Sequence, residues 1–322
     1  MTKRFPFPGI PNGWYAVAAS DEIPRGKAVA RRYFDRELVV YRTDSGAVRV
    51  ADAFCPHLGA HLGRVGQVDG EQLRCGFHGL RYDPSGACVS IPSGAPPPRR
   101  ARLHFWDVRE RNGWVLVWFD PFGAPARWEV PPLDEAGWNR PRWRVQEIAT
   151  TPQETTENSV DFAHFTELHG FVDGSITRPI STRDEFLSTA YCAHRPLGVP
   201  GLPKYKLPVF YHVEVWGLGY SQVDVSIPRL GLDLRIFVLP VPIDEEHIEL
   251  RLAASTKNAV PLLGLLTRRI AHHILCSEVD QDLDIWNYKA YIETPALMKG
   301  DGPVAEYRRW AQQFYPEPST EA

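Results

Sequence analysis

The 322-residue chain lacks long apolar segments and any strong excess of one charge. Its most apolar stretches, such as LRIFVLPVPI, contain prolines and are shorter than the roughly 18 residues that a membrane-spanning helix needs. Lys and Arg together number 36 and Asp and Glu 39, which gives a formal net charge of −3. This balance provides no basic patch for a nucleic acid. We therefore expect no membrane span and no nucleic-acid partner.

Cysteine is scarce, and the spacing of the five cysteines does not resemble a disulfide framework. The N-terminal stretch MTKRFPFPGIPNGWY begins with basic residues but has no apolar segment of the secretory type. These two features predict a cytoplasmic protein. The sequence also has no G-x-G-x-x-G fingerprint after a strand pattern, so we expect no dinucleotide site in this chain.

Two regions with different patterns are joined by a proline- and glycine-rich stretch at 120–141, DPFGAPARWEVPPLDEAGWNRP. The first region has short strand-like runs between turn signals such as TDSG, VDGE and DPSG, which predicts an all-β domain over 1–125. In the second region TTENSVDFAHFTELHG is predicted to be helical, four strand-like runs follow, and a helix of roughly 261–291 comes last. Strands in succession before a long helix indicate an α+β domain with an antiparallel sheet over 126–322.

The first region contains two closely spaced Cys–His pairs. Cys55-x-His57 is followed, after seventeen residues, by Cys75-x-x-His78. Zinc is the commoner metal for two thiolates and two imidazoles, but zinc fingers pair cysteine with cysteine and histidine with histidine. A Rieske 2Fe–2S cluster needs mixed pairs, because two thiolates bind one iron and two imidazoles bind the other. The order and spacing therefore predict a Rieske cluster bound by these four residues.

The predicted ligands also indicate what the cluster does. Neutral imidazoles in place of anionic thiolates leave the cluster less negative, so that it accepts an electron at a higher potential. Such a cluster relays single electrons. His61 lies in the same stretch but outside the ligand pattern, and we expect it to be a loop histidine.

The second region has a candidate metal site of its own. ENSVDFAHFTELHG contains Asn158, Asp161, His164 and His169. The two histidines are about one and a half helical turns apart, and they could share a metal if the helix is distorted. Non-haem iron oxygenases bind their metal with two histidines and one carboxylate, which leaves positions open for dioxygen and substrate.

The carboxylate of such a site is expected from the last helix. The stretch SEVDQDLDIW offers four acids, and spacing alone does not choose among Glu278, Asp280, Asp282 and Asp284. A simpler interpretation makes the two histidines ordinary helix residues and the protein a two-domain electron carrier without mononuclear iron. The number of irons per chain separates the two interpretations.

With these motifs, the chain resembles the Rieske non-haem iron oxygenases, in their terminal oxygenase component, over nearly its whole length. The resemblance rests on the two Cys–His pairs, on Asn158-x-x-Asp161-x-x-His164-x4-His169 and on the late acidic helix. Within the family the chain is most similar to the steroid branch, the 3-ketosteroid 9α-hydroxylases and the cholesterol 7-desaturases. The matching stretches are GIPNGWYAVAAS and QDLDIWNYKAYIETPALMKGDGPVAEYRRWAQQFY.

The resemblance implies a catalytic domain whose antiparallel sheet wraps around the long helix, a helix-grip or START-like arrangement. It places the metal-binding carboxylate four residues before Trp286, at Asp282. Mononuclear Fe(II) would then be bound by His164, His169 and Asp282. Asn158 is expected to form a hydrogen bond near the iron.

The resemblance also implies a role for Asp161 and an oligomeric state. Asp161 would accept a hydrogen bond from His164 and reach a Rieske histidine of the neighbouring subunit, here His78. Electrons would therefore pass between the subunits of a head-to-tail homotrimer.

The implied reaction is the oxidation of a C–H bond of a sterol or steroid by dioxygen, with electrons from a separate NAD(P)H-dependent reductase or ferredoxin. Hydroxylation, desaturation and oxidative demethylation all begin with hydrogen abstraction, so the residues do not separate them. An alternative keeps the machinery but takes an aromatic acid or an O- or N-methyl compound, and Arg178, Arg183 or Arg195 could bind its carboxylate. The segment 192–210 is expected to form part of the pocket wall, although it does not match the family pattern.

Overall fold

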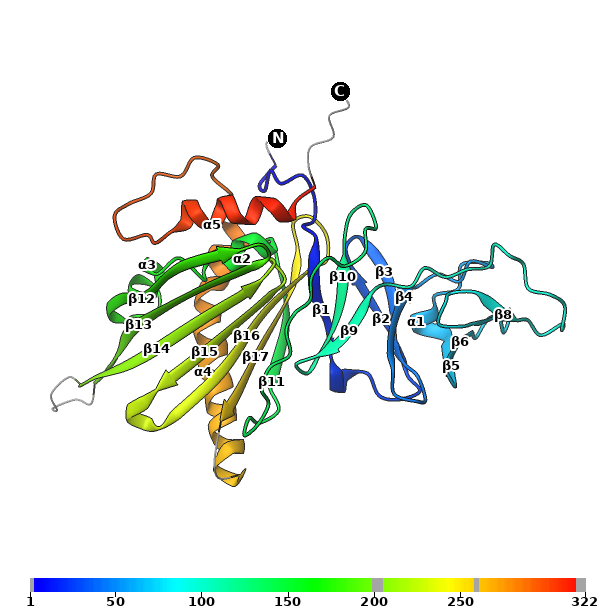
Figure 1. Cartoon of the computed structure of the whole chain (residues 1–322), viewed down its shortest axis with the longest axis horizontal. Coiled ribbons are helices and arrows are strands. Elements are labelled where there is room, and N and C mark those ends of the chain that lie inside the picture. Colours follow the sequence, from blue (N-terminus) through cyan, green and yellow to red (C-terminus); the bar gives the residue numbers. More distant parts are fainter. Residues whose placement is uncertain (1–2, 199–204, 258–260, 317–322) are drawn as a thin grey trace. The chain divides into compact units, whose positions relative to one another are not determined.

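The computed structural model of the chain describes residues 3–198, 205–257 and 261–316 (Figure 1). Contacts divide it into two compact units, Tyr15–Pro132 and Met1–Trp14 with Leu133–Ala322. The N-terminal residues therefore belong to the same unit as the C-terminal part of the chain. Within the described ranges, no helix combines the length and the apolar character that a bilayer crossing needs.

The unit Tyr15–Pro132 is built from small sheets, as the strand-like runs predict. Their strand orders are β1-β10-β9, β2-β3-β4 and β5-β6-β7-β8. The strands are β1 (Gly13–Ala19), β2 (Ala28–Tyr33), β3 (Arg36–Arg42), β4 (Val48–Asp52), β5 (Gly66–Asp69), β6 (Gln72–Cys75), β7 (Arg81–Tyr82), β8 (Cys88–Ser90), β9 (Val108–Arg111) and β10 (Trp114–Phe119). Two short helices join them, η1 (Ser20–Glu22) and α1 (Leu62–Val65).

The two cysteines of the Cys–His pairs are part of the core of this unit. Cys55 and Cys75 are buried in one cluster with Leu62, Leu73 and Tyr82. Burial of these apolar side chains stabilises the fold. The same packing fixes the backbone at both cysteines.

The second unit contains one large antiparallel sheet. Its seven strands follow the order β11-β17-β16-β15-β14-β13-β12. The strands are β11 (Arg142–Ile148), β12 (Val172–Arg183), β13 (Phe186–Leu197), β14 (Tyr205–Trp216), β15 (Tyr220–Ile227), β16 (Leu232–Pro242) and β17 (Ile248–Lys257), with η2 (Pro228–Leu230) between β15 and β16. Of the segment 192–210, residues 199–204 lie outside the described residues, and the rest belongs almost entirely to β13 and β14.

The long helix α4 (Pro261–Tyr288) lies along one face of this sheet (Figure 1). Leu275, Val279 and Trp286 pack against strand residues such as Leu250 and Leu252 in a single buried cluster. The spacing of the three helix residues places them on one side of α4, as expected for an amphipathic helix. The predicted antiparallel sheet around a long helix is thus confirmed.

The segment predicted as one helix over 155–170 forms two short helices, α2 (Pro152–Glu157) and α3 (Ala163–Glu167). The break between them is held locally, because the Asp161 carboxylate accepts a hydrogen bond from the Ala163 N–H at 3.2 Å. Polar side chains of this type bind nearby backbone N–H groups and so compete with a continuous helix. The break supplies the distortion that a shared metal at His164 and His169 requires.

Ion pairs anchor α2. The fully buried Glu154 lies 2.8 Å from the Lys289 ammonium, and Glu157 accepts from the Arg308 guanidinium at 2.7 Å. Arg308 belongs to α5 (Val304–Ala311), which the short helix η3 (Gln312–Phe314) follows. The polypeptide after α4 therefore fixes α2, and with it the start of the segment that contains the two histidines.

Candidate metal centres

The two Cys–His loops of the first unit have the same backbone geometry. The Gly59 N–H donates to the Cys55 carbonyl at 2.9 Å, and the Gly79 N–H donates to the Cys75 carbonyl at the same distance. Both glycines have positive φ, 74° and 70°, in the left-handed region that glycine adopts without strain. The first loop therefore turns tightly two residues after His57, and the second turns one residue after His78. In each loop the turn places the Cys and the His of the pair close together.

The side chains in these loops are sorted by type. Both cysteines are buried, whereas His57 is exposed and His78 half-buried, with their ring centroids 4.7 Å apart. Two inward thiols and two outward imidazoles match the donor set of a 2Fe–2S cluster whose histidine-bound iron faces the surface. We infer that these four residues can hold such a cluster.

The surroundings of the Cys55 thiol disfavour its ionised form. Burial raises the pKa of Cys55, and the contact of its sulfur with the Tyr82 hydroxyl at 3.0 Å only partly opposes this effect. Thiolates are the form that binds iron, and a bound metal deprotonates them. His61, by contrast, accepts a hydrogen bond from the Gly63 N–H at 3.2 Å and caps α1, so it has a local structural role.

In the second unit, His164, His169 and Asp282 converge. Their candidate ligand atoms all lie within 4.8 Å of one another. His164 belongs to α3, His169 follows that helix in a loop, and Asp282 belongs to α4. Among the described residues this is the one group of three or more His, Cys, Asp or Glu side chains with such a spacing.

Asp282 is held in a polar but desolvated position. The Asn158 amide donates to its Oδ1 at 3.4 Å, and its Oδ2 lies 3.6 Å from the His169 Nε2. Burial raises the pKa of Asp282 to about 6, and the negative charges of Glu278 and Asp161 add to the shift while His164 opposes it. A buried carboxylate of this kind gains from a bound cation.

Asp161 lies beside the first histidine. Its Oδ2 is 3.6 Å from the His164 Nδ1. Burial raises the pKa of Asp161, but hydrogen bonds and the charge of His164 outweigh that effect, so the net pKa is below its usual value. An ionised Asp161 can hold the His164 ring with Nδ1 protonated, which leaves Nε2 for a metal.

The second histidine is kept neutral. Burial lowers the pKa of His169 to about 4, with further lowering by the nearby His164 and Arg195. A neutral imidazole is the form that binds a metal. At neutral pH the ring is therefore available as a ligand without first losing a proton.

The structure separates the four acids that spacing left open. Glu278 forms an ion pair with Arg195 at 2.7 Å, Asp280 pairs with Arg144 at 2.6 Å, and Asp284 is exposed. Asp282 is the acid of this set that joins the two histidines. The geometry thus favours Asp282 as the carboxylate ligand, and the assignment stays a proposal.

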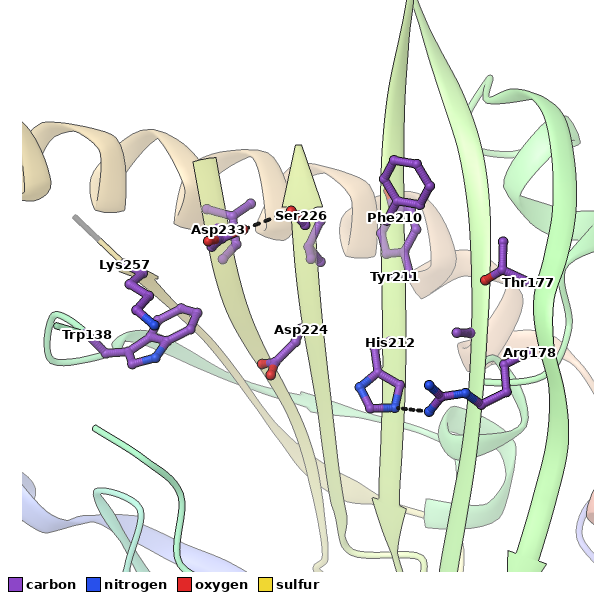
Figure 2. Close-up of a pocket in the computed structure, with 13 residues that line it drawn as sticks. Trp138, Thr177, Arg178, Phe210, Tyr211, His212, Asp224, Ser226, Asp233 and Lys257 are labelled. Atoms are coloured by element: carbon purple, nitrogen blue, oxygen red, sulfur yellow. Dashed lines mark hydrogen bonds between the residues drawn. The ribbon is translucent and has the colours of Figure 1, made fainter. Parts of the chain in front are cut away.

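The three arginines considered for a substrate carboxylate lie in different places. Arg195 donates to the His169 carbonyl at 3.0 Å, near the metal centre. Arg178 lies on the other face of the sheet, where it donates to His212 at 3.1 Å in a shallow hollow of about 360 Å³ (Figure 2). Figure 2 shows α4 behind the sheet at this hollow, and Arg183 is exposed at the end of β12. Arg195 is therefore the one of the three beside the metal centre.

Sequence reasoning missed the ion pair between Arg195 and Glu278. Each residue was considered alone, Arg195 for a substrate and Glu278 as a ligand. The i, i+4 spacing of Glu278 and Asp282 predicts that both carboxylates lie on one side of α4. No sequence signal pairs Glu278 with a residue of β13, because that contact depends on the tertiary fold.

Two family models match the chain. The model described as 3-Ketosteroid 9alpha-hydroxylase C-terminal domain matches residues 117–315, and the Rieske [2Fe-2S] domain matches residues 13–106. Together they cover both candidate centres.

Relatives match almost the whole chain. Cholesterol 7-desaturase nvd 1 of Ciona intestinalis is 31% identical over 333 residues, which cover 97% of this chain and 70% of that protein. The 3-ketosteroid-9-alpha-monooxygenase oxygenase component of Rhodococcus rhodochrous is 27% identical over 323 residues, which cover 94% of this chain and 79% of that protein.

Solved structures show the same fold. Dicamba monooxygenase bound to dicamba has a TM-score of 0.73 at 19% identity, covering 94% of this chain and 97% of that one. Pseudomonas putida CBB5 NdmA with caffeine has a TM-score of 0.74 at 21% identity, covering 93% and 89%. At these identities the likeness concerns the fold alone.

A ligand substitution tests the second centre. Asp282→Ala should remove the mononuclear iron and keep the cluster, so that iron falls from about three to about two per chain. Iron analysis together with the EPR signal of the reduced cluster measures both. Asp284→Ala, two residues along α4 and exposed, is the matched control and should keep all the iron. Loss of iron in the control alone would show that a different acid of α4 is the ligand.

The raised pKa of Asp282 predicts a pH-dependent stability of the metal-free protein. The folded state binds the Asp282 proton more tightly than the unfolded state, so this contribution to stability is present below the ordinary carboxyl pKa and is lost as pH rises through about 6. Metal-depleted Asp282→Asn should therefore be more stable than the metal-depleted parent at neutral pH, by about 2–3 kcal/mol. Chemical unfolding at several pH values measures this difference, which should shrink towards pH 4. A difference that does not change with pH would contradict the shift.

Proposed function

The chain belongs to the Rieske non-haem iron oxygenases with a catalytic domain of the 3-ketosteroid 9α-hydroxylase type, and from this premise we propose that it oxidises a C–H bond of a sterol or steroid with dioxygen. In this proposal residues 1–125 form the Rieske domain and residues 126–322 the catalytic domain. The observation that carries it is the convergence of His164, His169 and Asp282. The names of the two relatives given above refer to cholesterol and to a 3-ketosteroid.

Bound at these centres, a Rieske cluster relays single electrons and a mononuclear iron activates dioxygen. The residues of the chain hold and orient the ligands. Asn158 fixes one oxygen of Asp282 and leaves the other towards His169. An iron held by His164, His169 and Asp282 would keep coordination positions for dioxygen and substrate. Asn158 and Asp161 would thus support the site without binding the metal.

The paired charges of Arg195 and Glu278 beside the second centre favour an uncharged substrate. Arg195 is the cation nearest to the ligands among those considered, and its guanidinium is already paired with Glu278 at 2.7 Å. It also lies 4.9 Å from the centroid of the Phe171 ring. A substrate carboxylate would have to break this ion pair, which would leave Glu278 as a half-buried unpaired charge. The arrangement therefore disfavours an aromatic acid.

An apolar cavity lies next to the helix that contains His164. It has a volume of about 550 Å³, which falls within the roughly 300–1,000 Å³ of small-molecule sites. One of its walls is Phe165, whose ring centroid is 4.6 Å from that of His164 and 5.5 Å from that of His169. Its other apolar walls include Phe162, Phe171, Ile176, Tyr191 and Ala193. Thr166 and Ser175 also line the cavity, so its mainly apolar wall suits a largely hydrocarbon substrate that carries a few polar groups.

The alternative substrates are O- or N-methyl compounds, which are uncharged and need no free cation. The same apolar cavity could take them, so the pairing of Arg195 argues only against acids. We rank sterols and steroids above O- and N-methyl compounds, because the relatives with the higher identity are named for sterols and steroids. The titles that name dicamba and caffeine belong to structures of 21% identity or less.

We further propose that the enzyme works as a head-to-tail homotrimer in which Asp161 connects His164 to His78 of the neighbouring subunit. Asp161 keeps 34% of its side chain exposed, so it can reach a second chain. In the Rieske unit, Leu58 and Phe77 next to the two histidines are 66% and 61% exposed. Exposed apolar side chains on both sides of the histidine pair are available to pack against another chain. They support burial of the cluster end against another subunit.

The electrons would come from a separate reductase or ferredoxin, since the relative from Rhodococcus rhodochrous is named an oxygenase component. A cytoplasmic location fits the cysteines, because all five lie in the described residues and none is in a disulfide.

The proposed substrate class is tested with the iron-loaded protein. We expect the spectrum of the mononuclear iron to change on addition of sterols and 3-ketosteroids, because a substrate in the cavity alters the coordination of the metal. Benzoates and methylxanthines are the comparison compounds and should leave the spectrum unchanged. Oxygen uptake with a surrogate reductase should then follow the same order of compounds. A response to benzoates alone would reject the sterol assignment.

The role of Asp161 is tested with Asp161→Asn, which keeps the size of the side chain and removes its charge. We expect both iron centres and the oligomer to be retained but turnover to be almost lost, because the bridge to the neighbouring cluster is weakened. Single-turnover experiments should show the cluster staying reduced. Electron transfer at the parental rate in this variant would remove Asp161 from the pathway.

A further inference from the structure

Two buried polar atoms without a hydrogen-bond partner face each other beside the metal centre. The Nδ1 of His169 and the Oε2 of Glu278 both lack such a partner, and they are 3.3 Å apart. An unpaired buried polar group is costly, and native structures rarely leave two of them side by side. The pair is therefore expected to form a hydrogen bond in some state of the protein.

Metal binding defines that state. The Nε2 of His169 is the nitrogen near Asp282, so a shared metal would take Nε2. A neutral imidazole bound through Nε2 must have its proton on Nδ1. That N–H would then lie beside a carboxylate oxygen, with Nδ1 and Oε2 3.3 Å apart and so within hydrogen-bond distance. Asp282 thus lies beside Nε2, the nitrogen that would bind the metal, and Glu278 lies beside Nδ1. This placement makes Asp282 the candidate metal ligand and Glu278 a group that orients the ring.

Glu278 is itself fixed by Arg195. The Oε1 of Glu278 lies 2.7 Å from the guanidinium of Arg195, while its Oε2 faces the ring. The same guanidinium donates to the backbone carbonyl of His169 at 3.0 Å. His169 is thereby held at two points, the ring by Glu278 and the backbone by Arg195.

His169 needs such support because no helix holds it. It follows the end of α3, and its own backbone lies in the loop before β12. Arg195 comes from β13 and Glu278 from α4, both of which are long elements packed into the sheet. A loop residue is therefore positioned by two rigid elements, as a precise metal site requires.

We propose that Glu278 and Arg195 form a positioning pair that orients His169 for metal binding, so that each histidine of the centre is held by its own carboxylate. Asp161 orients the ring of His164, and Glu278 orients the ring of His169. The proposal rests on the proposed mononuclear centre and assigns Glu278 no part in binding the metal.

The test measures the affinity of the centre for a metal and the NMR resonances of the histidine Nδ1–H protons. It does not depend on enzyme activity. The mononuclear centre is loaded with Co(II) while the cluster is kept oxidised, and bound Co(II) shifts the exchangeable Nδ1–H resonances of its histidine ligands. We expect two shifted resonances in the parent protein. Glu278→Gln should weaken Co(II) binding by about tenfold and Glu278→Ala by up to about a hundredfold. In both variants one resonance should move and exchange faster with water, and the other should stay.

Matched variants separate orientation from general damage. Arg195→Lys keeps a positive charge but not the forked guanidinium, and it should shift the same resonance as the Glu278 variants. Asp280→Asn, which removes an exposed ion pair on the same helix, should change neither the affinity nor the resonances. Asp161→Asn should move the other resonance, the one assigned to His164.

Three outcomes overturn the proposal. Unchanged affinity and unchanged resonances in the Glu278 variants would show that Glu278 does not orient the ring. If Gln281→Ala weakened Co(II) binding and the Glu278 variants did not, the ring would be held by the Gln281 amide, which also contacts His169. If the parent bound no Co(II) in a manner sensitive to Asp282→Ala, the mononuclear centre itself would be rejected together with its positioning pair.

Discussion

The packing of α4 against the sheet is the constraint on which the mononuclear centre depends. Leu275, Val279 and Trp286 fix the helix on β17 and its neighbours, and this sets both its rotation and its height. Asp282 can meet the two histidines only at that rotation, since neighbouring positions of a helix point about 100° apart. The acids before and after it show the consequence, because Asp280 points to Arg144 and Asp284 to solvent. One apolar interface thus decides which carboxylate can serve as the ligand.

The charges at this centre are balanced for a cation. Asp161, Glu278 and Asp282 surround two histidines, and Arg195 neutralises one of the three acids. Without a metal, burial above all, and then the negative charges of Glu278 and Asp161, raise the pKa of Asp282. The fold therefore accepts an unfavourable arrangement of charge that a divalent ion would relieve. A site of this kind trades some stability of the metal-free protein for binding of the metal.

The sequence predicted the features that depend on near neighbours. The Cys55–His57 and Cys75–His78 pairs each belong to one loop, so their spacing already indicates a mixed donor set, and His164 and His169 are close in the chain for the same reason. The acids of α4 differ from these, because helical periodicity offers several of them and only tertiary packing selects one. The pairing of Arg195 with Glu278 was beyond prediction, since it joins β13 to α4 across 82 intervening residues. The break between α2 and α3 also escaped the sequence pattern, because local hydrogen bonds at Asp161 and Ala163 outweigh helix propensity there.

The two carboxylates beside the histidines differ in what surrounds them, and this difference separates their tasks. Glu278 is tied to Arg195 and keeps 19% of its side chain exposed, so its second oxygen is directed inwards at His169. Asp161 has no such cation in its described contacts and is 34% exposed, so it can share its charge with a group outside the unit. A carboxylate fixed by an arginine can hold a ring still, whereas one that is open to solvent can also respond to a partner. The geometry of the metal centre would then be set from within the catalytic domain, and its supply of electrons from outside it.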